Sequence, residues 1–155
     1  MPIQLAEWLR TGHILPLRWG ATAHDFVDFW PTAQAEIDHL RAFGCPYIVL
    51  DDVEFYFTTD PFEDLCEICI QVWALPEEAN SAYFDYGWLR PGLTNSQVQA
   101  ALQAQGIAYK IERGPAFQTP NLRTAEGILF GFYSDFETEA DARLMKVYLG
   151  QQTGF

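Results

Sequence analysis

A six-residue motif that occurs twice places the strongest constraint on how this chain can fold. Residues 17–22 read LRWGAT and residues 89–94 read LRPGLT, so Leu, Arg, Gly and Thr recur at one offset of 72 residues. Such self-similarity is typical of folds built from repeated supersecondary units. With 155 residues, the chain is long enough for one domain with a sizeable core. We therefore expect a single domain over residues 1–155, containing two diverged copies at about 13–75 and 82–150.

Each copy of the motif is interpreted as the entry to a helix. Glycine permits an unusual backbone turn there, and the threonine hydroxyl can cap the free amides of the first helical turn. Apolar residues then follow at helical spacing. They are Phe26, Phe29 and Trp30 in the first copy, and Val98, Ala101 and Leu102 in the second. Further helices are predicted over residues 4–10 and 31–43.

Alternating apolar residues predict pairs of strands after these helices. Residues 53–57 (VEFYF) and 128–132 (ILFGF) have the strand period, and a second alternating run follows each of them, at 68–72 and 147–149. Short strands joined by turns favour antiparallel pairing. Residues 47–50, 82–88 and 107–113 are further strand candidates, and 114–121 is predicted to be a loop. The predicted fold class is α+β, with the helices packed on one face of an antiparallel sheet.

The second copy carries a resemblance to known families. Residues 90–102 (RPGLTNSQVQAAL) resemble the small α/β domain of the bacterial outer-membrane assembly lipoprotein family. The tandem duplication is similar to the β-lactamase inhibitor protein fold, in which paired helical segments pack on an antiparallel sheet. Relatives of that fold inhibit an enzyme or scaffold an assembly, so the resemblance implies protein binding. As a class, immunity proteins of bacterial toxin systems are similarly small and acidic.

The negative charge is concentrated in one segment of the chain. The net charge is −12, and residues 42–89 hold ten acids without any Lys, Arg or His. This field repels nucleic acid and anionic membranes and attracts a basic partner protein. A solvated face that only keeps the protein soluble is the alternative interpretation. The residues predicted to bind a partner are Asp51, Asp52, Glu54, Asp60, Glu63, Asp64 and Glu67.

Known chemical motifs find little support in the sequence. Cys66 and Cys69 form a C-x-x-C, but they lie inside a predicted strand, where residues three apart point to opposite sides. The acidic spacings match no EF-hand loop, and His13, His24 and His39 have no partner motif. We therefore predict no catalytic residues, no metal site and no cofactor.

The location and function are predicted from these absences and from the charge. The chain begins without a signal-peptide pattern, has no membrane-spanning stretch, and holds an odd number of cysteines. These features favour a cytoplasmic protein with free thiols. The first hypothesis is a non-catalytic protein-binding module, inhibitor or immunity-like, that meets a basic protein through its acidic surface. A structural or self-associating domain and a small carboxylate hydrolase are the alternatives.

Overall fold

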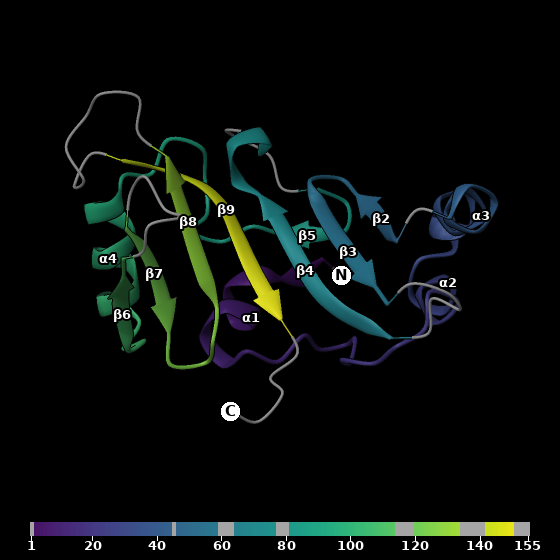
Figure 1. The fold of residues 1–155 in the computed structure, drawn as a ribbon, viewed down its shortest axis with the longest axis horizontal. Coiled ribbons are helices and arrows are strands. Elements are labelled where there is room, and N and C mark those ends of the chain that lie inside the picture. Colours follow the sequence, from purple (N-terminus) through teal and green to yellow (C-terminus); the bar gives the residue numbers. More distant parts are fainter. Residues whose placement is uncertain are drawn as a thin grey trace.

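The protein is built around a seven-stranded antiparallel sheet. The computed structural model describes residues 2–44, 46–58, 64–76, 81–113, 120–133 and 142–150. Strands lie in the order β2-β3-β4-β9-β8-β7-β6, and each neighbouring pair is antiparallel (Figure 1). Their bounds are β2 Tyr47–Leu50, β3 Val53–Phe57, β4 Leu65–Gln71, β6 Tyr109–Glu112, β7 Asn121–Thr124, β8 Leu129–Tyr133 and β9 Arg143–Gly150.

Four α-helices accompany this sheet in the described residues, so the prediction of a mixed α+β fold with an antiparallel sheet is confirmed. They are α1 Leu5–Thr11, α2 Asp25–Phe29, α3 Gln34–Phe43 and α4 Asn95–Ala104. Short 3₁₀ turns follow α2 and β4, as η1 (Pro31–Ala33) and η2 (Val72–Ala74). In Figure 1, α1 lies behind the sheet, whereas α3 lies at its β2 end and α4 at its β6 end.

One strand prediction was wrong in detail, and one strand was missed. Residues 82–88 do not form a strand of the main sheet. Only Phe84–Asp85 is extended within this segment, as strand β5. Strand β5 pairs in parallel with β1 (Ile3–Gln4). The alternation of aromatic residues in this segment reflects the burial of Phe84 and Tyr86 in the core. Strand β7 was not predicted, because its sequence NLRT has none of the apolar alternation that marked the other strands.

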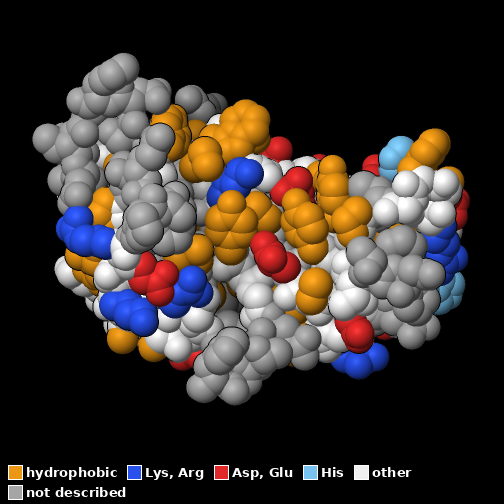
Figure 2. All heavy atoms as spheres, viewed as in Figure 1, with side chains coloured by type: hydrophobic (Ala, Val, Ile, Leu, Met, Phe, Trp, Pro, Cys, Tyr) orange, Lys and Arg blue, Asp and Glu red, His pale blue; other side chains and the backbone are white. Residues whose placement is uncertain are grey.

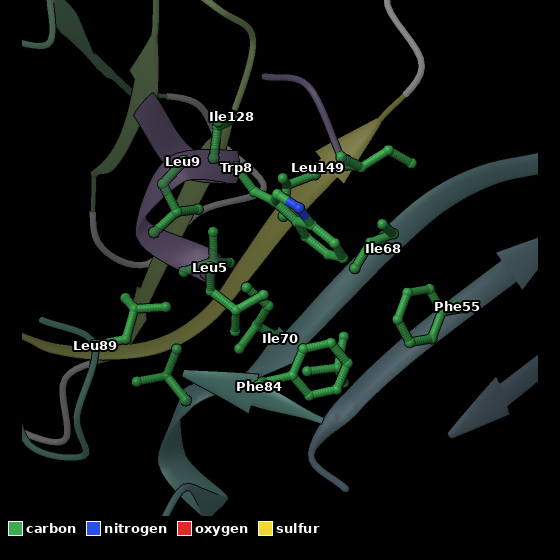
Figure 3. Packing of buried hydrophobic residues seen from close by; sticks show 14 of the residues in the cluster. Leu5, Trp8, Leu9, Phe55, Ile68, Ile70, Phe84, Leu89, Ile128 and Leu149 are labelled. Carbon is green, nitrogen blue, oxygen red and sulfur yellow. The ribbon is translucent and has the colours of Figure 1, made fainter. Parts of the chain in front are cut away.

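One face of the main sheet forms the wall of the hydrophobic core. Val53, Phe55 and Phe57 are buried along β3, while the side chains between them are partly exposed. Helix α1 packs Leu5, Trp8 and Leu9 toward this wall, where Ile68, Ile70 and Leu149 lie (Figure 3). The indole of Trp8 also meets Phe84 edge-on, with ring centroids 6.3 Å apart. The core therefore joins residues from both ends of the chain.

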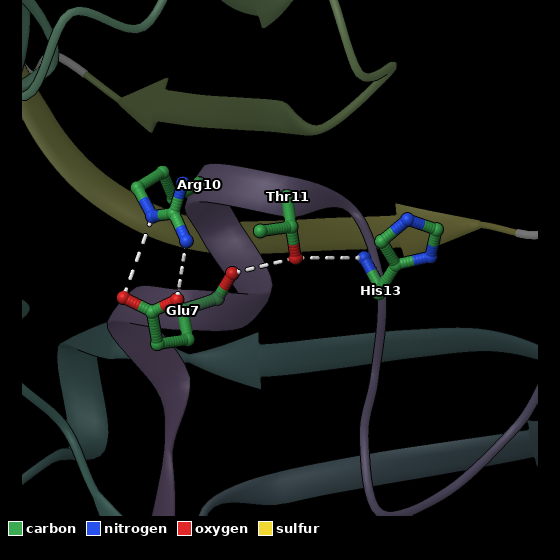
Figure 4. A network of polar contacts seen from close by, with 4 residues as sticks. All are labelled: Glu7, Arg10, Thr11 and His13. Atoms are coloured by element: carbon green, nitrogen blue, oxygen red, sulfur yellow. Dashed lines mark hydrogen bonds and ion pairs between the residues drawn. The ribbon is translucent and has the colours of Figure 1, made fainter.

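Helix α1 ends in a small polar network on the surface. Gly12 adopts a left-handed backbone, with a φ of 74°, and its amide donates to the carbonyl of Trp8. Figure 4 shows Arg10 paired with Glu7, at 2.6 Å, and the Thr11 hydroxyl between the Glu7 carbonyl and the His13 amide. These contacts hold the turn that leads the chain away from α1.

The two copies of the sequence motif contain the same pair of hydrogen bonds, although α4 begins directly after its N-cap Thr94 and α2 begins three residues after Thr22, with His24 as its N-cap. Thr22 Oγ1 accepts from the Asp25 amide at 3.1 Å, and the Asp25 carboxylate accepts from the Thr22 amide at 3.0 Å. Thr94 and Gln97 make the same reciprocal pair, at 3.2 and 2.9 Å, which is a capping box. The preceding glycines, Gly20 and Gly92, have φ angles of 82° and 83°.

The strands that follow the motifs also match. The register of β3 against β4 shifts between Tyr56 and Phe57, and that of β8 against β9 shifts between Gly131 and Phe132. After each shift the phenylalanine faces the leucine near the start of the next strand, Leu65 in one case and Leu144 in the other. Each leucine amide then donates to a motif carbonyl at 2.8 Å, that of Ala21 and of Leu93 respectively.

Candidate functional site

The second face of the main sheet, which we call the outer face, carries polar and aromatic side chains. Directly paired residues on neighbouring strands share a face. The registers define one row that crosses the whole sheet: Val49, Glu54, Cys69, Tyr148, Leu129, Arg123 and Lys110. Only Cys69 in this row is buried. Figure 2 shows hydrophobic side chains gathered over β3, β4 and β9, with acidic groups between them.

Charge divides the outer face into two halves. The β2–β4 half holds Glu54 and Glu67, whereas the other half holds the cations Lys146, Arg123 and Lys110 and one acid, Glu112. Arg123 donates through Nε to Glu112 at 2.6 Å, and Nζ of Lys110 lies 3.9 Å from the same carboxylate. The strands of the β2–β4 half, which we call the acidic half, come from the segment 42–89 that holds ten acids in the sequence.

A pocket of about 400 Å³ lies at the edge of the acidic half. Three carboxylates line it, those of Asp51 and Asp52 in the β2–β3 turn and that of Glu54 on β3. Gln71, Trp73 and Lys146 line it as well, from β4, η2 and β9. The pocket thus combines carboxylates, an indole and one ammonium group.

A chain of hydrogen bonds orders the pocket and the adjoining strand. The indole Nε1 of Trp73 donates to Gln71 Oε1 at 2.8 Å, and Gln71 Nε2 donates to Glu54 Oε1. The Tyr56 hydroxyl donates to the same carboxylate oxygen at 3.2 Å, and its ring lies 5.1 Å from that of Tyr47. An indole can only donate and a carboxylate can only accept, so the orientation of the Gln71 amide is fixed.

Burial perturbs several titratable groups around this site. It raises the pKa of Asp52, and the neighbouring Asp51 carboxylate adds to that rise. It raises the pKa of Glu67 as well, and that of the Cys69 thiol to about 12, where the Glu54 carboxylate contributes. Burial next to Glu54 also raises the pKa of Tyr56. Each shift disfavours the negative form, because that form loses hydration or meets another negative charge.

The predicted acids do not form one cluster. Asp51, Asp52 and Glu54 line the pocket, and Glu67 lies on the outer face opposite Tyr56. Asp64 precedes β4 and is exposed at the opposite end of that strand from Gln71, a separation of roughly 20 Å at the rise of a strand. Asp60 and Glu63 lie outside the described residues.

Sequence reasoning missed the other groups of the pocket. Because side chains alternate between the two faces of a strand, the sequence could have placed Gln71 on the same face as Cys69, which lies two residues earlier. The position of Trp73 depends on the η2 turn, and that of Lys146 on the pairing of β4 with β9, where Gln71 faces Lys146. No local signal in the sequence marks either of these features.

The described residues give no sign of a metal centre or a transmembrane helix. They contain no group of three or more His, Cys, Asp or Glu side chains placed to hold a metal ion. Among the helices of the described ranges, none has the length and apolar character needed to cross a bilayer. Comparisons with protein-family models, curated proteins and solved structures found nothing that matches this chain.

Proposed function

We propose that this chain is a non-catalytic protein-binding module that docks a basic protein on the acidic half of its outer face. The observation that carries the proposal is the composition of this half. Tyr47, Tyr56 and Trp73 stand beside Glu54 and Glu67 on a sheet face whose reverse side forms the core. Tyrosine and tryptophan are favoured anchors at interfaces, and surrounding carboxylates speed the encounter with a cationic partner.

We also propose that the chain consists of two diverged copies whose helices cover one face of the sheet. Matching threonine hydrogen-bond pairs, Thr22 with Asp25 and Thr94 with Gln97, and matching register shifts support this. Leu65 and Leu144 are 79 residues apart and face equivalent phenylalanines. The same offset relates Cys69 to Tyr148, and these two are direct partners between β4 and β9. A local twofold axis through that pair would relate the copies, as in a symmetric dimer.

Affinity capture tests the proposed function directly. Tagged protein is used to capture partners from lysate of its source, washed at low and then high salt, and the eluate is identified by mass spectrometry. The double variant Glu54→Gln/Glu67→Gln is compared with Glu36→Gln/Glu126→Gln, which makes the same charge change at exposed sites on α3 and in the β7–β8 turn. We expect a basic protein that salt releases, that the first variant loses and that the second retains.

Two results would count against this function. Equal capture by both double variants would remove the acidic half as the docking surface. Recovery of the chain itself as the main captured species would favour self-association, in which the acidic half of one copy meets the half of another copy that holds Lys146, Arg123 and Lys110. Light scattering at two protein concentrations tests self-association independently, because the average molar mass of a protein that dimerises rises with its concentration.

A further inference from the structure

The pocket offers a chemical combination that selects a particular side chain. Its lining brings together the carboxylates of Asp51, Asp52 and Glu54 and the indole of Trp73. That indole is 59% exposed, although its Nε1 is fixed by Gln71. An exposed indole held in one orientation beside carboxylates is a surface on which a cation can stack while it donates hydrogen bonds.

We propose that this pocket receives one arginine side chain of the partner, stacked on Trp73 and paired with Glu54 and the Asp51–Asp52 turn. The inference rests on the proposed function, since the arginine belongs to the basic protein that docks on the acidic half. To the proposed function, this inference adds the type of side chain that the partner inserts and the pocket that receives it. The hollow of about 400 Å³ is of the size that binds small ligands and single side chains.

The lining favours a guanidinium group over other cations. A guanidinium is planar, presents five donors in a fixed fork, and can stack on an aromatic ring while its edge faces carboxylates. Lysine has a compact, strongly hydrated ammonium group that gains less from the indole face. The ammonium of Lys146 stands in the same lining, so three carboxylates face one positive charge and a second cation is still attracted.

The strand pairing keeps these groups in position before binding. Glu54 is held by Gln71 and Tyr56, and Gln71 is held in turn by Trp73. Preorganised partners lose little side-chain entropy when a ligand arrives. An arriving cation also relieves the repulsion between the Asp51 and Asp52 carboxylates, so binding strengthens as the pH rises and Asp52 ionises.

The test uses the full chain and two small probes that differ in charge. N-acetyl-arginine amide and its neutral analogue N-acetyl-citrulline amide are titrated at constant ionic strength while the tryptophan indole N–H signals are followed by NMR. The Trp73 signal is assigned with Trp73→Phe. We expect a saturable shift of that signal in the millimolar range with the arginine probe and a binding at least about tenfold weaker with citrulline.

Variants locate the contact. Glu54→Gln should weaken arginine binding about tenfold, because a charge-assisted hydrogen bond becomes a neutral one, whereas Glu36→Gln on α3 should leave it unchanged. Urea unfolding midpoints confirm that each variant is folded. Equal binding of the two probes, or a Glu54→Gln variant that binds as the parent does, would overturn the proposal.

Failure of this inference and failure of the proposed function are distinguishable. In one outcome, capture yields a basic partner that the Glu54→Gln/Glu67→Gln variant loses, while the arginine probe does not shift the Trp73 signal. That result supports the docking surface and refutes the arginine pocket. If the probe binds at Trp73, this binding depends on Glu54, and capture yields no partner, the result supports the arginine pocket and refutes the protein-binding function.

Discussion

Glu54 shows how one side chain can be fixed on an otherwise open sheet face. Its Oε1 accepts from both Gln71 and Tyr56, one on the neighbouring strand and one on its own strand. The same carboxylate helps to raise the pKa of the Cys69 thiol and of the Tyr56 hydroxyl. Burial is the larger cause of both shifts, and the Glu54 carboxylate adds to it because a second negative charge beside it is disfavoured.

Glu67 should make stability depend on pH. Burial raises its pKa in the folded state above the ordinary value of 4.5, so the folded protein binds a proton that the unfolded chain has already lost. The stability cost of ionising Glu67 is absent below pH 4.5 and complete above the raised pKa. Because the Glu67 side chain is exposed, solvent screens most of this cost, so Glu67→Gln should stabilise the protein by at most a few tenths of a kcal/mol at neutral pH.

Urea unfolding of the Glu67 variant at a series of pH values measures this effect. The difference in unfolding free energy between the variant and the parent protein should grow as the pH rises from 4.5 to the raised pKa of Glu67. Below pH 4.5 this difference should vanish. A constant difference across that range would show that the substitution acts through packing rather than through ionisation.

Cys69 should be inert as a thiol in the native protein. It is 2% exposed, and burial together with the Glu54 carboxylate raises its pKa to about 12. Because the thiolate is the reactive form, alkylation by iodoacetamide at pH 8 should leave Cys69 unmodified and should modify it fully in urea. Peptide mass spectrometry separates its labelling from that of Cys66 and Cys45. Rapid labelling of Cys69 without denaturant would contradict the assigned burial.

The paired helix entries give a prediction at the level of elements. Thr94 caps α4, so Thr94→Ala should lower the free energy of unfolding by about 1 kcal/mol. Thr22 accepts from an amide three residues later in the turn before α2, so Thr22→Ala should lower it as well, because the Asp25 amide loses its side-chain acceptor. Equilibrium urea unfolding measures both. Thr22→Ser and Thr94→Ser are the matched controls, because they keep the hydroxyl and should lose only a small part of the stability. A loss at one site alone would argue against equivalent helix entries.

Trp8 allows the prediction of one domain to be tested for the whole molecule. Its side chain is 2% exposed, contacts Phe84 and donates its indole N–H to the Leu15 carbonyl. Trp8→Phe leaves part of this volume empty and removes the hydrogen bond, and Trp8→Ala removes the ring and should cost about 3–5 kcal/mol. Because Trp8 joins the beginning of the chain to the second predicted copy, both variants should unfold in a single transition.

Far-UV circular dichroism and tryptophan fluorescence, followed together in urea, check that expectation. Coincident curves with a lowered midpoint are the expected result. Two separate transitions, with only one shifted by the substitution, would divide the chain into two independently folding parts.

The sequence predicted those features that depend on local pattern. Helices α1 and α3 and the alternation of β3 follow from the periodicity of the apolar residues. The pocket could not be predicted in the same way. Lys146 reaches Gln71 only through a pairing that joins strands about 75 residues apart, and the position of Trp73 depends on a 3₁₀ turn after β4.

The position of β9 between β4 and β8 has a consequence for synthesis on the ribosome. Residues 143–150 follow all the other described strands in sequence but occupy the middle of the sheet. Until they emerge, β4 and β8 both present open edges, and unpaired edges are where nascent chains associate wrongly. Translation that stalls just before residue 143 should therefore leave a species prone to aggregation or bound by chaperones, although most of the hydrophobic core has already been made.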